Sequence, residues 1–525
     1  MALNPGSKTT PVRTVFNCSQ VFRGYSLNSS LALGPENGLN SLHAILLRFR
    51  EDEVAAQGDI TKQYYMLRIE PEEEMMQLWC WRFAGEEKIR TFCMTRMGMG
   101  LKPSSNFAVI AMKETSKLED FEAKYPVARK ALSEDSYVDN TFVTGKSVEV
   151  VKEKIEEINF VASHGGFKYK EWVISRENVP EQVISIHLPN AIGENEEKAL
   201  GVFWEVYNDE FYFKVEISAG GKKTTKKINI LPHLEKNPCQ SIPNSLPPLA
   251  LTIRICLSVH AKTHDPLGLI FPVKMIGTLL FRETLQHMNQ AYNRERNKIK
   301  GKIPWDTEID DDFKEKWLDY FSILHSLQKV KFPRSMKPKN TNPAIAPTLV
   351  TFSDGNPDAF GTVAYAVWTL LDGSKKVTLV MSKAKLGPLQ YKGETTRNEL
   401  AGATDAARVK CWILENSDLK FCSHIPFLDS KIVQDMIKKE SYGYNTFAGL
   451  RVAEIQQKTD VDNWRHIPSG ENIADILTKG AKPDKIGPDS AWQCGPGWLA
   501  KDESEWPVTN TAKLTVDERM MFRIS

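Results

Sequence analysis

The chain has 525 residues, of which 41% are hydrophobic and 26% are charged, and these values exclude a wholly disordered chain. Its length predicts roughly two to four domains, because one hydrophobic core rarely serves more than about 250 residues. The 68 Lys and Arg residues are balanced by 66 Asp and Glu residues, so the composition does not indicate a uniformly basic nucleic-acid-binding protein.

Neither a secretory signal nor a membrane span is predicted. The N-terminus lacks the apolar segment of a signal peptide, and no run of about 18 apolar residues occurs. The eight cysteines form no CxxC pair and no His–Cys cluster with zinc spacing, which favours reduced thiols. We therefore expect an intracellular protein, cytoplasmic or nuclear, without a membrane partner, and no oligomeric state is predicted.

Hydrophobic periodicity predicts mixed elements in the first part of the chain. Residues 43–52 have a helical pattern, residues 54–69 begin as a strand, and residues 147–166 form an amphipathic helix that ends at glycines. Aromatic and β-branched residues at 199–218 surround an Asn-Asp pair, which is typical of a hairpin.

Two proline-rich segments, 235–250 and 332–347, interrupt regular structure. Helices are predicted between them at 266–292 and 311–327. The remaining elements are expected to alternate between strand and helix, in the order strands 348–356, 361–371 and 376–382, a helix from about Glu399, strand 424–430, one helix, strand 462–468 and a last helix from about Glu471. This order indicates helices packed on a central sheet.

Four acids in this last region fall at the ends of predicted elements: Asp354, Glu399, Asp429 and Asp475. Strand ends on one edge of a sheet converge, and carboxylates that meet there repel one another unless cations neutralise them. Two Mg²⁺ or Mn²⁺ ions held by such acids would activate a water for phosphodiester cleavage. Each acid taken alone is more often a helix cap or a turn residue, and the spacing of the four together does not decide between these readings.

The sequence around these acids resembles the ribonuclease H region of BEL/Pao-type retrotransposon polyproteins. The resemblance is carried by "FSDGNPDAFGTVAYAVW", "ETTRNELAGATDAARV", "FLDSKIVQDMI" and "WRHIPSGENIADILTKG". It implies a ribonuclease H fold that cleaves the RNA strand of an RNA–DNA hybrid, with the four acids as metal ligands. His466 would then assist product release or proton transfer, although a hydrogen-bonded structural histidine is an equal alternative. The family often has Ala-Ser where this chain has Gly355-Asn356.

Two further acids, Asp59 and Asp139, occur near predicted strands of the first part. One acid on each of two adjacent strands is the minimum for the two-metal chemistry of nucleotidyl transfer. Tyr64 follows Asp59 by five residues, where an aromatic ring could lie beneath a nucleotide sugar. A single "VD" in a turn is more often unrelated to metals.

The context of these residues resembles the reverse transcriptase palm of the same BEL/Pao group. The matching segments are "GDITKQYYMLRI" and "ALSEDSYVDNTFVTGKSVEVVKEKIEEINFVASHGGFKYKEW", and the similarity continues to "AKTHDPLGLIFPV". Gly100 and Ser104 are kept from a substrate-binding motif that contacts the template strand. The family has a second Asp at Asn140 and an Asp at Asn17, so the resemblance implies an impaired polymerase.

We expect an α+β and α/β multidomain protein: a partial reverse transcriptase palm with an antiparallel sheet and helices, a helical Pao connection, and a ribonuclease H-like mixed sheet with helices. The segments are 11–180, 181–345, 346–482 and a C-terminal tail, 483–525. No Asp-Thr-Gly or Asp-Ser-Gly tripeptide occurs, so an aspartic peptidase lacks its motif.

The predicted function is that of a ribonuclease H-type endonuclease with a degenerate RNA-directed DNA polymerase, using two Mg²⁺ or Mn²⁺ ions per active site. Its partners would be an RNA–DNA hybrid or a primer–template, and deoxynucleotides if polymerase activity survives. The alternative is a catalytically inactive or domesticated nucleic-acid-binding remnant.

Overall fold

A computed structural model describes residues 2–3, 12–13, 16–34, 38–175, 196–219, 228–234, 249–295, 302–391 and 393–509. Most of the proline-rich segment at 235–250, the start of the predicted connection and the tail beyond residue 509 lie outside these residues. The chain divides into two compact units, Met1–Gly193 and Glu194–Ser525. The second unit contains the predicted connection from residue 194 onwards together with the predicted ribonuclease H-like segment, and the four segment boundaries stay predictions.

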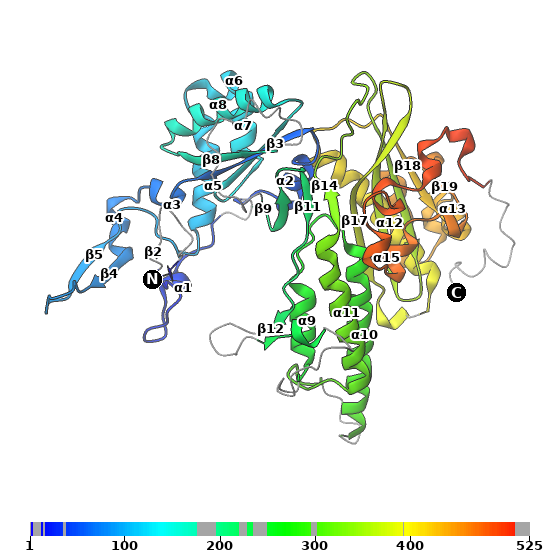
Figure 1. Cartoon of the computed structure of the whole chain (residues 1–525), viewed down its shortest axis with the longest axis horizontal. Coiled ribbons are helices and arrows are strands. Elements are labelled where there is room, and N and C mark those ends of the chain that lie inside the picture. Colours follow the sequence, from blue (N-terminus) through cyan, green and yellow to red (C-terminus); the bar gives the residue numbers. More distant parts are fainter. Residues whose placement is uncertain are drawn as a thin grey trace. The chain divides into compact units, whose positions relative to one another are not determined.

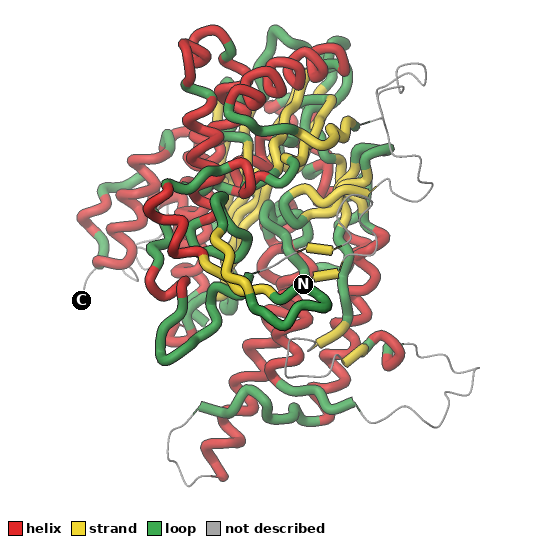
Figure 2. Tube along the Cα trace, turned by 90° about the vertical axis from the view of Figure 1, so that its left-hand side faces the viewer, coloured by secondary structure: helices red, strands yellow, loops and turns green. Residues whose placement is uncertain are grey.

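Both units combine sheets with helices (Figure 2), so the predicted mixed α/β, multidomain class is confirmed. No helix in the described part of the chain is long and apolar enough to cross a membrane.

The first unit is built on an antiparallel sheet with the strand order β6-β7-β3-β8 (Figure 1). Its strands are β3 (Val54–Ile60), β6 (Ser136–Tyr137), β7 (Asn140–Gly145) and β8 (Tyr169–Ile174). Asp59 of β3 pairs in register with Asn140 of β7. The strand and the hairpin that carry the two predicted polymerase acids are therefore neighbours.

Helix α8 (Val148–His164) shows why the first unit folds as predicted at 147–166. The side chain of Ser147 accepts a hydrogen bond from the N–H of Val150 and caps the helix. Apolar residues recur every three or four positions along α8 and are buried against the sheet and helices α5 (Ser104–Thr115) and α7 (Pro126–Ser133). The other helices and strands of this unit are α1 (Leu27–Ser30), α2 (Leu42–Arg48), α3 (Gln63–Met66), α4 (Pro71–Glu74), α6 (Phe121–Lys124), β1 (Ala2–Leu3), β2 (Val12–Arg13), β4 (Leu78–Trp81) and β5 (Arg90–Cys93).

The second unit contains a five-stranded sheet with the order β17-β16-β15-β18-β19. Strands β17, β16 and β15 are antiparallel, whereas β18 and β19 continue the sheet in parallel with β15. Their bounds are β15 (Thr348–Gly355), β16 (Ala359–Thr369), β17 (Lys375–Leu386), β18 (Ser423–Leu428) and β19 (Arg465–His466). The predicted mixed sheet is therefore present.

Helices α12, α13, α14 and α15 accompany this sheet, and α12 packs on β15 and β16. Their bounds are α12 (Thr395–Asn416), α13 (Lys431–Ile437), α14 (Thr446–Lys458) and α15 (Asp475–Lys479). Three details differ from the sequence prediction. Helix α12 begins four residues before Glu399, two α-helices rather than one lie between β18 and β19, and the helix predicted from about Glu471 begins at Asp475. The N–H of Ala474 donates to the side chain of Asn472, and this turn delays the helix start.

The predicted connection contributes long helices and a second sheet to the same unit. Helices α10 (Phe271–Glu295) and α11 (Asp311–Ser326) run side by side in Figure 1 and contact each other. Residues 266–270, expected to be helical, instead form a turn before α10. The remaining elements are α9 (Ile253–Ala261), α16 (Ala491–Cys494), β9 (Glu196–Ala199), β10 (Val202–Glu205), β11 (Glu210–Tyr212), β12 (Ser218–Ala219), β13 (Ile228–Asn229) and β14 (Lys331–Pro333).

Hydrogen bonds from Ser382 to two main-chain carbonyls attach the turn before α10 to the five-stranded sheet. The N–H of Ser382 in β17 donates to Leu267 O at 2.9 Å, and its hydroxyl donates to Gly268 O at 2.5 Å. Gly268 has a φ of +72°, and a Cβ atom there would lie 2.2 Å from Ser382 O. Only glycine fits this contact without displacing the strand.

Replacing Gly268 by Ala should therefore destabilise the second unit more than the same change at Gly373. Both glycines have positive φ, at +72° and +84°, but a Cβ atom at Gly373 meets nothing within 4 Å. Left-handed strain of about 1–2 kcal/mol applies to both variants, whereas Gly268→Ala adds about 1–3 kcal/mol of overpacking. Urea unfolding of the full chain would measure the difference, and equal losses in the two variants would contradict this packing.

Candidate metal centre

Three acids from separate elements meet at one edge of the five-stranded sheet. Asp354 is the penultimate residue of β15, Asp429 follows the end of β18, and Glu399 lies near the start of α12. Because β15 and β18 are parallel, their carboxyl ends reach the same edge. One carboxylate oxygen from each acid lies within 4.8 Å of the other two. This is the only group of three or more candidate metal ligands among the described residues.

A close backbone approach at Gly355 brings Glu399 into this group. A Cβ atom on Gly355 would lie 2.1 Å from the main-chain N of Glu399, and one on Gly402 would lie 2.7 Å from Asp354 O. Helix α12 therefore rests directly on the end of β15. The glycine that stands where the family often has alanine is the residue that this approach requires.

The loop after Gly355 is held by side-chain amides. Asn356 Oδ1 accepts the N–H groups of Asp358 and Ala359, at 2.9 and 2.8 Å. The amide of Asn398 donates to Asn356 O at 2.6 Å. The start of α12 is thus tied to the strand that carries Asp354.

Burial and repulsion within the cluster shift the ionisation of Glu399 and Asp354. Burial raises the pKa of Glu399 to about 9, and repulsion from Asp429 and Asp354 contributes further. Burial also raises the pKa of Asp354 to about 6, opposed by a hydrogen bond from the Thr478 hydroxyl and reinforced by repulsion from Asp429. A cation among these oxygens would reverse both shifts.

The donor set fits a hard divalent ion. Asp429 Oδ1 is buried and has no hydrogen-bond partner among the described residues, an arrangement that usually costs free energy. The other groups of the cluster are also carboxylates, which Mg²⁺ and Mn²⁺ prefer to nitrogen or sulfur ligands.

Asp475, the fourth predicted ligand, lies beside this group but outside the set of oxygens within 4.8 Å. Its negative charge raises the pKa of both Asp354 and Glu399. Its carboxylate pairs with Lys479 Nζ at 2.7 Å, one turn later in α15. The hydrogen bond that Lys479 donates to Asp475, with attraction to Asp475, Asp354 and Asp429, raises the pKa of Lys479, so this ammonium group lies within the field of the acids.

His466 is buried and contacts the main chain of the site rather than a carboxylate. Its Nε2 lies 3.0 Å from Asp429 O, and its Nδ1 contacts the hydroxyl of Thr509. Burial lowers the pKa of His466, so donation from Nε2 to the carbonyl and acceptance by Nδ1 fit a neutral ring. The predicted role in proton transfer stays a prediction, and the contacts position Asp429.

Two residues that hold Asp354 were not identified from the sequence. The Thr478 hydroxyl donates to Asp354 Oδ2, and the amide of Asn472 donates to Ser353 O at 2.9 Å. Thr478 lies three residues after Asp475, hence on a neighbouring part of the same helical turn. This three-residue spacing is the sequence feature from which Thr478 could have been identified.

The predicted polymerase residues lie together in the first unit. Asp139 O accepts the N–H of Ile60, next to Asp59, at 2.8 Å. The amide of Asn140 donates to Asp139 Oδ1 at 3.3 Å and accepts from Gln57 Nε2 at 3.0 Å. Asn140 therefore places a hydrogen-bond donor against the carboxylate that a metal would need.

Tyr64, Gly100 and Ser104 have local structural contacts. The Tyr64 hydroxyl lies 3.0 Å from Ser105 Oγ, and burial raises its pKa while the charge of Asp139 adds to the shift. Gly100 has a φ of +110° and its carbonyl accepts from Asn28 Nδ2 at 2.9 Å. Ser104 donates to Gly98 O at 2.9 Å. Their roles in binding substrate stay predictions.

Comparison with family models matches residues 252–430 to the Pao retrotransposon-like RNaseH-like domain. The matched stretch includes Asp354, Glu399 and Asp429, together with α9, α10 and α11. It confirms the predicted relationship to Pao retrotransposons, and the chain contains an RNaseH-like domain of that type. No curated protein matches the sequence.

Two solved structures are similar to the chain at low identity. One is the foamy viral protease-reverse transcriptase dRH in complex with double-stranded DNA, with a TM-score of 0.46, 12% identity, and coverage of 85% of this chain and 60% of that chain. The other is the foamy viral protease-reverse transcriptase in complex with double-stranded DNA, with a TM-score of 0.42, 10% identity, and coverage of 83% and 71%. The chain thus spans 60% of the length of the first.

The raised pKa of Glu399 predicts an inverse dependence of stability on pH without divalent ions. Its folded pKa of about 9 exceeds the ordinary value of 4.5, so the folded state binds more protons between these values. The free energy of unfolding should fall as pH rises from 4.5 to 9. Glu399→Gln removes this loss and should be more stable than the wild type at pH 8, by up to about 5 kcal/mol.

The two chains should converge well below pH 4.5, where Glu399 is protonated in both states. Thermal unfolding in EDTA at several pH values measures this difference. Glu415→Gln, at an exposed position near the end of α12, is the matched control and should follow the wild type. Parallel pH profiles for the wild type and Glu399→Gln would contradict the crowding of the acids.

Proposed function

We propose that this chain, with its Pao-type RNaseH-like domain, is an endonuclease that cleaves the RNA strand of RNA–DNA hybrids. Asp354, Glu399 and Asp429 would hold Mg²⁺ or Mn²⁺ ions, and Asp475 would complete the set at the rim. The observation that carries the proposal is the convergence of three carboxylates, one with an unpartnered buried oxygen, at the end of two parallel strands.

Divalent ions bound here would supply an activated water and stabilise the leaving oxygen. The protein residues set up the site before binding. Glu399 retains its proton near neutral pH, because its pKa is about 9, and releases it when a cation is loaded. Thr478 fixes one oxygen of Asp354 by its hydrogen bond. His466 fixes the main chain at Asp429, so the two strand-end carboxylates keep their separation.

Asp475 and Lys479 would govern access to the open side of the cluster. The side chain of Asp475 is 36% exposed and that of Lys479 is 64% exposed, so both can exchange partners at low cost. Asp475 would have to break its ion pair with Lys479 before its carboxylate could bind an ion. Lys479 could then pair with a phosphate oxygen of the substrate.

The first unit would be a reverse transcriptase palm whose polymerase activity is impaired. Asp59 and Asp139 would be its metal ligands, and Asn140 lowers the negative charge available to a second ion. The hydrogen bond from Asn140 to Asp139 supports this impairment, because it occupies a carboxylate oxygen. Binding of a primer–template does not require these ions and would remain, as would contacts from Tyr64, Gly100 and Ser104.

Asp429→Asn should abolish cleavage of a labelled RNA–DNA hybrid in Mg²⁺ and in Mn²⁺. The amide removes a charge from the ligand set, so the loss should exceed the roughly 100-fold cost of losing an outer partner of a metal ligand. Gel analysis of the 5′-labelled RNA strand measures cleavage. Asp484→Asn, at an exposed acid beyond α15, is the control and should cleave at the wild-type rate.

Primer extension on the same sample distinguishes the polymerase activity of the first unit from the nuclease activity proposed for the second. The account predicts hybrid cleavage without efficient extension. Absence of hybrid cleavage by the wild type in either metal would contradict the proposed nuclease and favour a nucleic-acid-binding remnant.

A further inference from the structure

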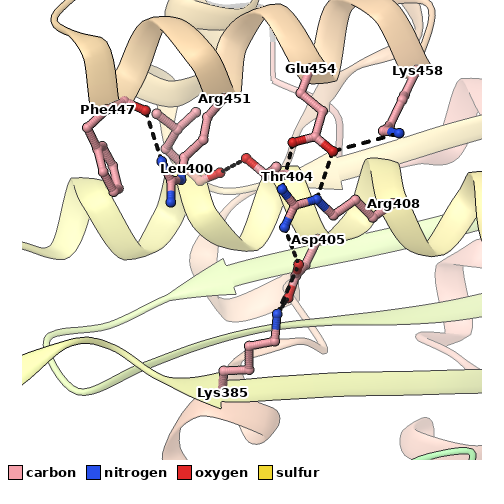
Figure 3. Close-up of polar contacts among 9 residues, drawn as sticks. All are labelled: Lys385, Leu400, Thr404, Asp405, Arg408, Phe447, Arg451, Glu454 and Lys458. Atoms are coloured by element: carbon pink, nitrogen blue, oxygen red, sulfur yellow. Dashed lines mark hydrogen bonds and ion pairs between the residues drawn. The ribbon is translucent and has the colours of Figure 1, made fainter.

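Two arginines share the ring of one phenylalanine on the surface formed by α12 and α14. The guanidinium carbon of Arg451 lies 3.7 Å from the ring centroid of Phe447, and that of Arg397 lies 4.6 Å from it. Arg451 also donates to Phe447 O at 3.0 Å, as Figure 3 shows. The Nε of Arg397 also pairs with the carboxylate of Glu394. Stacking on an aromatic ring orients a guanidinium group.

A ladder of ion pairs continues from α14 across α12 to β17 (Figure 3). Arg408 forms two hydrogen bonds to Glu454, at 2.8 and 2.7 Å, and lies 3.5 Å from Asp405. On its other side Asp405 pairs with Lys385 at 3.0 Å. The Asp405 side chain is only 1% exposed, whereas Arg408 and Lys385 are 48% and 45% exposed. The acid is thus beneath the surface and the cations lie above it.

The cations of this region outnumber the carboxylates that pair with them, which are Asp405, Glu454 and Glu394. Burial lowers the pKa of Lys383, where attraction to Asp405 opposes the shift and repulsion from Lys385 and Arg408 adds to it. Burial likewise lowers the pKa of Arg451, where Arg408 and Arg397 add to the shift and Glu454 and Asp405 oppose it. A bound anion would relieve the repulsion that remains at Lys383 and Arg451.

The arginines of α12 follow a line along the side of the helix that contacts α14. Arg397 and Arg408 are eleven residues apart, which is close to three helical turns, so they lie on nearly the same side of α12. Their separation along the axis is about 16 Å, which equals roughly five phosphate steps of one duplex strand. Arg397 is two residues from Glu399 but contacts α14 through Phe447.

We propose that Lys383, Lys385, Arg397, Arg408 and Arg451, here called the basic ridge, bind the phosphate backbone of a nucleic-acid duplex beyond the cleavage site. The choice of a nucleic acid rests on the proposed function, whereas the anionic character of the partner rests on the ridge itself. Contacts to successive phosphates position a duplex without reading its sequence. The basic ridge therefore binds hybrid and DNA duplexes alike and fixes the distance from the bound end to the metal centre.

Binding without cleavage is measured by fluorescence anisotropy in EDTA, with a labelled RNA–DNA hybrid and a labelled DNA duplex over a series of salt concentrations. Arg397→Gln and Arg451→Gln should each weaken binding to both duplexes. Each should reduce the slope of log K against log salt by about 0.9, the value for one phosphate contact. Lys485→Gln, at an exposed lysine away from α12 and α14, is the matched control and should leave both quantities unchanged.

Two additional variants separate charge from folding. Arg451→Lys keeps the charge and should keep the salt slope while losing part of the affinity, because lysine lacks the planar stack. Lys385→Gln alters an exposed side chain on a different strand and should again lower the slope, even if Arg451→Gln unfolds the domain. Thermal unfolding identifies any variant that has lost its fold.

Unchanged affinity and slope in folded Arg397→Gln, Arg451→Gln and Lys385→Gln would overturn the proposal. If these variants lost binding to poly-glutamate but kept their duplex binding, the proposal would also be overturned, and an acidic polypeptide would be identified as the occupant. None of these measurements depends on hybrid cleavage. If the proposed nuclease activity fails but the basic ridge binds nucleic acid, the protein should show duplex binding that depends on the ridge and no cleavage in Mg²⁺.

Discussion

The structure of the candidate site depends on the close contact between the start of α12 and the end of β15. At Gly355 the two backbones approach so closely that a side chain would overlap the main chain of Glu399. This contact holds Glu399 close to Asp354 and Asp429. Burial, together with repulsion among these acids, raises the pKa of Glu399 and of Asp354. Tight packing is thus used to hold like charges together, an arrangement that divalent cations stabilise.

The connection helices belong to the same structural framework as the site. Pro272 O, at the start of α10, accepts the N–H of Ala481 just after α15, and Trp492 Nε1 donates to Leu269 O at 2.7 Å. Through these bonds the turn before α10 fixes both ends of the segment that follows Asp475. The family match likewise runs from residue 252 through the first three acids. A ribonuclease H-like unit that begins at residue 346 would lack these supports.

Much of this arrangement could be predicted from local sequence patterns. Asp354 and Asp429 follow apolar strands, and strand ends on one edge of a sheet converge, so their meeting could be expected, whereas the parallel pairing that brings it about is seen only in the fold. The predicted helix at 147–166 and the hairpin around Asn208 are likewise found at α8 and at β10 and β11, because their hydrophobic periods are strong. Two helices, α13 and α14, occupy the stretch where a single helix was predicted, and the burial of α14 is confined to a few residues, such as Val452 and Ile455.

Features that depend on tertiary contacts could not be predicted in the same way. The role of Gly355 depends on the path of α12, which no local period reveals. Thr478 and Asn472 hold Asp354 across more than a hundred residues of chain. The arginine pair on Phe447 joins two helices that are adjacent only in the fold. The position of Asp475 beside the other acids, paired with Lys479, likewise depends on where the connection helices place α15.

The most direct test of the central claim is anomalous diffraction from crystals of the full chain grown with MnCl₂. The account predicts anomalous peaks bounded by the carboxylates of Asp354, Glu399 and Asp429, with Asp475 turned from Lys479 towards the second ion. A cluster that binds no manganese at millimolar concentration, with Lys479 still paired to Asp475, would contradict it.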